Sequence, residues 1–170
     1  MKKIILSVLF LAVSSMAAEV GKVPGVVSLS GDNGGKVDGT VWSSKTLKGK
    51  VHIVFYVDPD KKDMNEALSK ALKKRHFDRS KYASVAIINL AATWMPNVAI
   101  EAKLKSKQKE FPDTTYVKDK KKVLVKKWNL ADDNSDVLVF NKSGTLIYKK
   151  FGKLSAKEIQ NVLAIIEKNL

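Results

Sequence analysis

The sequence predicts an α/β domain of three layers, with a mixed central sheet and helices on both of its faces. Residues 51–57 (VHIVFYV) and 84–90 (SVAIINL) are almost continuously apolar, as expected of parallel strands that are buried on both faces. Between them the apolar residues recur at helical spacing, which gives the order strand, helix, strand. A β-hairpin and a last helix follow. Together these segments favour one mixed sheet between helical layers.

The helix between the two apolar strands is predicted to begin at Asp63. Asp63 and Glu66 have the spacing of a capping box. The apolar residues that follow lie on one helical face: Met64, Ala67, Leu68, Ala71 and Leu72. A second helix is expected over 97–109, because Pro96 suits the first turn of a helix.

The C-terminal third predicts short strands, a hairpin and a capped helix. Residues 114–117 (TTYV) and 122–128 (KVLVKKW) favour two shorter strands. Residues 136–151 favour a hairpin, with NKSG as its turn. Ser155 and Glu158 form a second capping-box pattern before an apolar helical stripe. A βαβ half followed by a ββα half is the thioredoxin arrangement, and residues 18–50 would be its N-terminal β extension.

The N-terminus is typical of a secretory signal peptide. Lys2 and Lys3 precede an apolar run, and small residues occupy the positions before a cleavage site after Ala17. The apolar run is too short for a comfortable transmembrane helix, and no second long run follows. We therefore expect a signal peptide over 1–17, cleavage near Ala17-Ala18, one domain over 18–170 and a periplasmic protein that is not integral to the membrane.

The composition excludes whole classes of chemistry. The chain has no cysteine, which rules out thiol oxidoreductases, thiol peroxidases and cysteine-ligated metal sites. No Walker, G-x-S-x-G or H-E-x-x-H motif is present either. The sequence therefore predicts no cofactor and no catalytic residues.

The formal net charge is +14, and lysine runs supply most of it. Secretion argues against nucleic acid as the partner. The lysines either solvate the surface or dock on an anionic component of the cell envelope. The candidates for contacting such a component lie in the two central helices: Lys70, Lys73, Lys74, Arg75, Lys103 and Lys107.

Several long stretches resemble the YtfJ family of small secreted bacterial proteins. They include GKVHIVFYVDP, FDRSKYASVAIINLAATWMP and NSDVLVFNKSGTLIYKKFGKLSAKEIQNVL, and the resemblance covers most of residues 45–168. It implies a thioredoxin-like fold, a periplasmic location and no established activity. The label "transcriptional regulator" sometimes given to the family does not fit a secreted protein. Both halves of a thioredoxin redox site are missing, because DPDKKDMN replaces the C-x-x-C loop and Ser135-Asp136 replaces Thr with cis-proline.

Two acidic loops mark where that redox site would lie. In a thioredoxin-like fold the loop after residues 51–57 and the loop before the hairpin face each other. The candidate site residues of these loops are Asp58, Asp60, Asp63, Asp132, Asp133 and Asp136. Six carboxylates there predict helix caps and turns, or a patch for a basic partner segment or a divalent cation. Oxygen ligands would favour calcium or magnesium, although an EF-hand is excluded because Lys62, Asp63 and Ser69 occupy essential loop positions.

These observations leave three functions open. The first is a periplasmic thioredoxin-like protein without redox activity, which binds an unknown protein as an accessory of the cell envelope. The second is a cysteine-independent enzyme that uses the loop carboxylates. The third is a basic protein that docks on anionic envelope components. The absence of a catalytic motif favours the first.

Overall fold

The computed structural model describes residues 16–170, and residues 1–15 of the expected signal peptide lie outside this range. The strands are β1 (Ser28–Leu29), β2 (Gly34–Lys36), β3 (Trp42–Ser43), β4 (Val51–Val57), β5 (Tyr82–Asn89), β6 (Thr114–Asp119), β7 (Ser135–Phe140) and β8 (Leu146–Phe151). The α-helices are α1 (Glu66–Arg75), α2 (Asn97–Glu110), α3 (Val123–Trp128) and α4 (Ala156–Asn169). Short 3₁₀ turns lie at Gly31–Asn33, Ser44–Leu47 and Pro59–Lys61.

The central sheet is mixed, as predicted. Its strand order is β2-β6-β5-β4-β7-β8, and β1 pairs with β3 in a separate two-stranded ribbon. Strands β4, β5 and β6 are parallel, whereas β7 runs antiparallel to β4, and β8 and β2 close the two edges antiparallel to their neighbours. The carboxyl ends of β4, β5 and β6 and the amino end of β7 therefore meet at one edge of the sheet.

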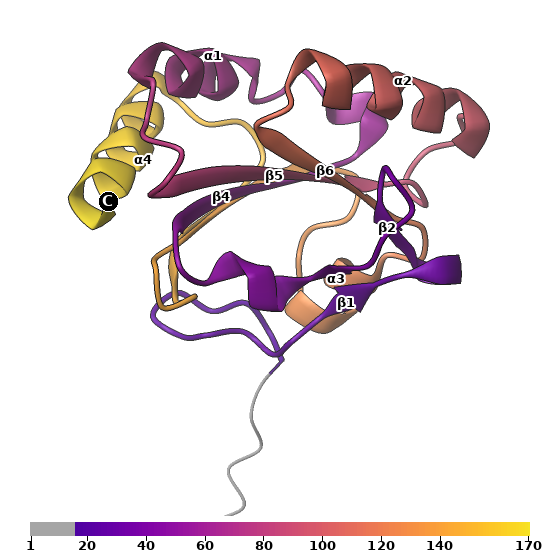
Figure 1. Cartoon of the computed structure of the whole chain (residues 1–170), viewed down its shortest axis with the longest axis horizontal. Helices are drawn as coiled ribbons and strands as arrows, with labels where there is room; N and C mark the ends of the chain where they lie inside the picture. The colour runs from indigo at the N-terminus through magenta and orange to yellow at the C-terminus, as the bar shows by residue number, and fades with distance from the viewer. Residues whose placement is uncertain (1–15) are drawn as a thin grey trace, which may run out of the picture.

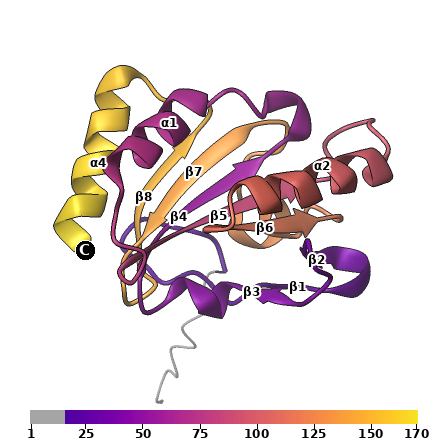
Figure 2. The same cartoon turned by 45° about the horizontal axis from the view of Figure 1, so that its top comes forward.

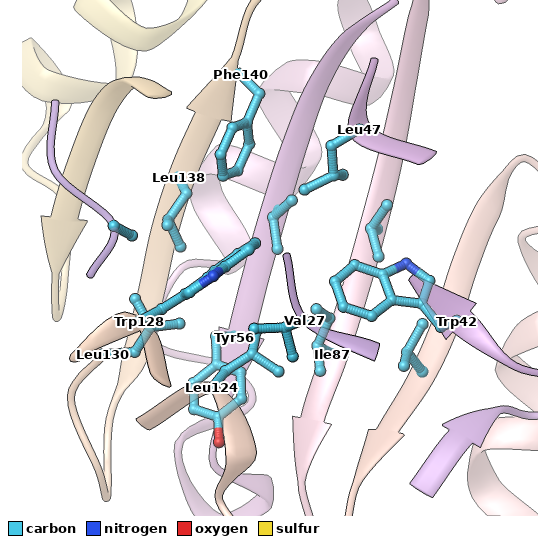
Figure 3. Packing of buried hydrophobic residues seen from close by; sticks show 14 of the residues in the cluster. Val27, Trp42, Leu47, Tyr56, Ile87, Leu124, Trp128, Leu130, Leu138 and Phe140 are labelled. Carbon is cyan, nitrogen blue, oxygen red and sulfur yellow. The ribbon is translucent and has the colours of Figure 1, made fainter. Parts of the chain in front are cut away.

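Helices cover both faces of the sheet (Figures 1 and 2). Helices α1, α2 and α4 lie on one face, whereas α3 and the ribbon of β1 and β3 lie on the other. Apolar side chains of α1 and α4 pack on β4 and β7. This cluster includes Leu68 of α1, Ile53 of β4 and Val139 of β7. The opposite layer packs around the buried rings of Trp42 and Trp128, which Figure 3 shows on either side of β4. Within residues 16–170 no helix is long and apolar enough to cross a membrane.

Two predicted elements differ from the structure. Residues 122–128 were expected to form a strand, but Val123–Trp128 is the helix α3. The Asp119 carboxylate accepts hydrogen bonds from the backbone N–H groups of Lys121, Val123 and Leu124 at 2.9–3.2 Å, which fixes the first turn of a helix. The valines of residues 122–128 favour a strand, but the buried Asp119 carboxylate, which lies outside this segment, stabilises a helix instead.

Helix α1 begins at Glu66 rather than at Asp63. The expected capping box is absent, because the Asp63 carboxylate pairs with Lys62 at 2.7 Å and only its backbone carbonyl meets the Glu66 N–H. Turns between residues 58 and 65 take the place of the predicted first helical turn. At the other end of the chain the predicted capping box of α4 is present, with Ser155 and Glu158 as its members.

The described chain is folded from its first residues. Ala18 is fully buried, and its N–H donates to the Trp128 carbonyl at 3.0 Å. Lys149 Nζ donates to the Ala18 carbonyl at 2.7 Å. A domain that begins at Ala18, as expected from the sequence, would therefore have its N-terminal residue built into the layer around Trp128.

Candidate functional site

The two acidic loops lie side by side at the edge where β4, β5 and β6 end. Val57 of β4 pairs with Ser135 of β7, so the residues just beyond them are brought together. The Asp58 N–H donates to the Asn134 carbonyl at 2.8 Å, which joins the loops directly. We call this region the acidic edge, and its polar side chains are Asp58, Asn89, Asp119, Asp132, Asp133 and Asp136.

We refer to Asp58 and Asp133, two neighbouring carboxyls of the acidic edge, as the Asp58–Asp133 pair. Asp58 is only 1% exposed, and its Oδ1 accepts the Asp60 N–H at 2.8 Å. Its Oδ2 is enclosed without a hydrogen-bond partner among the described residues. Burial raises the pKa of Asp58, and the adjacent carboxyl of Asp133 raises that pKa further. The pair therefore favours a shared proton or a positive group between the two carboxyls.

Asp132 is held in a different way from its neighbour Asp133. Lys122 Nζ lies 2.6 Å from Asp132 Oδ2, and Asn89 Nδ2 donates to Asp132 Oδ1 at 3.0 Å. The hydrogen bond from Lys122 is the main reason that the pKa of Asp132 lies below its usual value. Asp132 is thus an ionised, neutralised group that joins the loop to the end of β5.

Asp136 is buried inside β7 and does not reach the loops' surface. It is fully enclosed, its Oδ2 accepts the Ala131 N–H at 2.8 Å, and its Oδ1 has no hydrogen-bond partner among the described residues. Burial raises the pKa of Asp136 to about 7, although Lys149 partly offsets this. Asp136 therefore changes its charge near neutral pH in the interior of the protein.

The structure does not gather the six predicted aspartates into one patch. Asp58 and Asp133 are paired, Asp132 is bound to Lys122, Asp136 is buried, and Asp60 and Asp63 face solvent. Within residues 16–170 no group of three or more carboxylates or histidines is placed to hold a metal ion. The six aspartates therefore occupy four different environments, and their role as a shared binding site stays a prediction.

Sequence reasoning missed several polar residues that organise this edge. Asp119, at the end of β6, also accepts from the Tyr56 hydroxyl at 3.1 Å. Asn65 joins three segments, because its amide donates to the carbonyls of Ser135 and Gly152 and accepts the Leu154 N–H at 3.0 Å. The only available signal was a polar residue at the end of each apolar strand, which does not reveal its partners.

The predicted anion-contacting residues divide into paired and unpaired groups. Lys70 pairs with Glu66, Arg75 with Glu167 and Lys107 with Glu110 at 2.6–2.8 Å. By contrast, three make no ion pair with any described residue: Lys73, Lys74 and Lys103. All six are exposed on α1 or α2.

Comparison with known proteins identifies the family. A family model described as "Bacterial protein of unknown function (YtfJ_HI0045)" matches residues 20–169, which is nearly the whole described domain. The chain belongs to the YtfJ family. An uncharacterised protein of Haemophilus influenzae is 30% identical over 128 residues, which are 74% of this chain and 70% of that protein. The uncharacterised protein YtfJ of Escherichia coli is 27% identical over 132 residues, which are 76% and 72% of the two chains.

Solved structures similar to this YtfJ-family chain have the thioredoxin fold. A thioredoxin domain of a thiol-disulfide oxidoreductase from Bacteroides vulgatus has a TM-score of 0.62 at 14% identity, over 86% of this chain and 96% of that one. A putative thioredoxin from Neisseria meningitidis has a TM-score of 0.60 at 14% identity, over 85% and 89%. At such low identity these similarities establish the fold alone. The cysteine-free sequence separates this chain from thiol redox chemistry.

Proposed function

We propose that this YtfJ-family protein is exported to the bacterial periplasm and acts there as a non-catalytic accessory protein that binds a positively charged segment of a partner. The Asp58–Asp133 pair carries the proposal, because the exposed Asp133 carboxyl lies next to Asp58, which has a carboxylate oxygen without a hydrogen-bond partner among the described residues. A lysine or arginine side chain that binds the exposed Asp133 carboxyl would form a charge-assisted hydrogen bond with it and would offset the charge of the buried Asp58 beside it.

A basic side chain fits this pair better than a metal ion does. Calcium takes six to eight oxygen ligands, and magnesium also prefers a full octahedron. Within residues 16–170 no group of three or more carboxylates or histidines is placed to hold a metal ion, and Asp132, next to Asp133, is already bound to Lys122. Calcium and magnesium are therefore alternative outcomes of the test rather than the proposed ligands.

Export is supported by the signal-like residues 1–17 and by the family match, which begins only at residue 20. We expect the protein in the periplasmic fraction, with Ala18 as its first residue by N-terminal sequencing. Cytosolic protein that retains Met1 would contradict export, and it would reopen nucleic acid as a partner for so basic a chain.

Binding is tested by comparing partners captured from periplasmic extract. The parent protein is compared with the Asp58→Asn, Asp133→Asn double variant, which removes both charges but keeps the side-chain shape. The control is Asp32→Asn, Asp113→Asn, which removes two exposed charges far from the pair in sequence. We expect a protein retained by the parent and the control, and released by salt, to be lost from the double variant.

The same variants distinguish the remaining possibilities. The melting temperature of the parent could shift in millimolar calcium or magnesium while that of the double variant does not. This result would show that the ligand of the pair is a divalent cation and not a basic segment. Turnover of a substrate that depends on Asp58 would replace the binding protein by a cysteine-independent enzyme. Identical capture by all three proteins would show that the pair has only a structural role.

A further inference from the structure

We propose that the outer surface of α1 and α2 is a docking face for an anionic lipid bilayer. The proposed export determines only which membrane the protein would meet. The docking face itself does not depend on it. It concerns the face of the molecule built by the helices, whereas the acidic edge lies at the ends of the strands.

The two helices lie on the same face of the sheet and present one common outer surface (Figures 1 and 2). Lys73 of α1 and Lys107 of α2 both lie over the ring of Phe111, with their Nζ atoms 5.6 and 4.9 Å from its centre. These cation–π contacts place the lysines of the two helices next to each other. The surface is therefore continuous from one helix to the other.

This surface has an excess of positive charge. Helix α1 carries four basic residues against one acidic residue, and α2 carries four against two. Five exposed lysines make no ion pair with any described residue: Lys73, Lys74, Lys103, Lys105 and Lys109. A shallow depression on the C-terminal half of α1 is lined entirely by Lys70, Lys73, Lys74 and His76. Negatively charged groups would find several free cations there.

Apolar side chains accompany the lysines on α2. Among residues 16–170, Trp94 and Val98 are the most exposed large hydrophobic residues, at 87% and 81%. Val98, Lys105 and Lys109 are separated by seven and four residues, so they lie on one outward stripe of the helix. Trp94 lies in the loop that leads into α2, four residues before Val98.

A bilayer is the partner that uses both features. Its anionic headgroups attract the lysines, and its interfacial layer accepts tryptophan and an aliphatic side chain. Inorganic phosphate or a soluble polyanion would engage the lysines but give no reason for Trp94 and Val98 to be exposed. The attraction should fall with added salt, because exposed charges are screened.

The experiment measures sedimentation of the purified protein with vesicles. We expect binding to vesicles of phosphatidylglycerol and phosphatidylcholine in equal parts, and no binding to pure phosphatidylcholine. Neutralising two lysines of the face, in Lys105→Gln, Lys109→Gln, should weaken partitioning by more than about tenfold. The matched control is Lys126→Gln, Lys127→Gln on α3, on the opposite face of the sheet, and it should change partitioning by less than about twofold.

Trp94, in the loop just before α2, provides an independent readout beside this face. Trp42 and Trp128 are each only 1% exposed, so a blue shift of the emission on vesicle binding reports Trp94. We expect such a shift in the parent and its loss in Trp94→Phe. Equal weakening by both lysine pairs would overturn the proposal in favour of net charge alone. Vesicle binding without a change in Trp94 emission, or binding to a soluble polyanion as strong as to vesicles, would also overturn it.

Failure of this proposal is distinguishable from failure of the proposed function. Vesicle binding is measured on purified protein and does not involve the Asp58–Asp133 pair. Absence of vesicle binding would leave export and partner capture as they stand. Conversely, a cytosolic protein that binds anionic vesicles through α2 would contradict export while leaving the docking face intact.

Discussion

At the scale of single residues, Asp136 is a buried group whose charge the fold disfavours. It is fully buried, one carboxylate oxygen has no partner among the described residues, and burial raises its pKa to about 7. In the unfolded chain its pKa is close to the ordinary 3.8. The folded protein therefore holds a proton that the unfolded chain loses between pH 4 and 7. The contribution of Asp136 to the free energy of unfolding therefore falls as pH rises through that window. Above the window this contribution is constant.

We expect Asp136→Asn to remove this pH dependence. Asparagine can still accept the Ala131 N–H, but it carries no charge at any pH. At pH 8 the variant should be more stable than the parent by about 2–4 kcal/mol, and at pH 4 the two should agree within about 1 kcal/mol. Urea unfolding at both pH values measures the difference. A difference between variant and parent that is the same at pH 4 and pH 8 would contradict the assignment.

At the scale of secondary structure, α3 depends on a residue that lies outside it. Asp119, at the end of β6, accepts three backbone N–H groups at the start of α3 and the hydroxyl of Tyr56 from β4. It is completely buried. One side chain therefore fixes the helix, the end of a strand and the central strand relative to each other.

Removing the acceptor should destabilise the protein far more than removing one donor. Asp119→Ala leaves several buried donors without a partner, and we expect a loss of about 3–5 kcal/mol. Tyr56→Phe removes a single hydrogen bond and should cost about 1 kcal/mol. The exposed Asp113, which pairs with Arg79 at 3.5 Å, is the control, and Asp113→Ala should change stability by less than about 0.5 kcal/mol. Urea unfolding of the three variants gives these values, and equal costs for Asp119→Ala and Asp113→Ala would contradict the role given to Asp119.

At the scale of the whole molecule, a thioredoxin fold is maintained without its characteristic chemistry. The chain has no cysteine. The loops that would hold a redox site are joined by the backbone hydrogen bond from the Asp58 N–H to the Asn134 carbonyl. The fold is therefore stabilised by its two packed layers and its polar edge rather than by a disulfide. Thiol reagents have no target in such a protein.

We accordingly expect complete indifference to redox conditions. The melting temperature should be the same with and without dithiothreitol, and insulin reduction and peroxide turnover should equal the blank, because no thiolate is available to attack. A thioredoxin measured in parallel serves as the positive control. Turnover by the pure protein that depends on dithiothreitol would contradict this prediction.

The sequence by itself determined the fold class and the strands at the centre of the sheet. Strand β4 was predicted with its observed bounds, because a run that is buried on both faces is apolar throughout. The capping box of α4 was also readable, since both of its members lie within four residues. The absence of thiol chemistry followed from composition alone.

Only the tertiary structure decided how the acidic edge is divided. Six aspartates look alike in sequence, but their environments differ in the folded protein. Lys122 stabilises the ionised form of Asp132, and burial raises the pKa of Asp136 to about 7. Asp58 and Asp133 are neighbouring carboxyls. The identity of α3 was decided in the same way, by Asp119 at the end of another element. Local patterns report which segments are apolar, whereas charge state and end geometry depend on neighbours that are distant in the chain and meet only after folding.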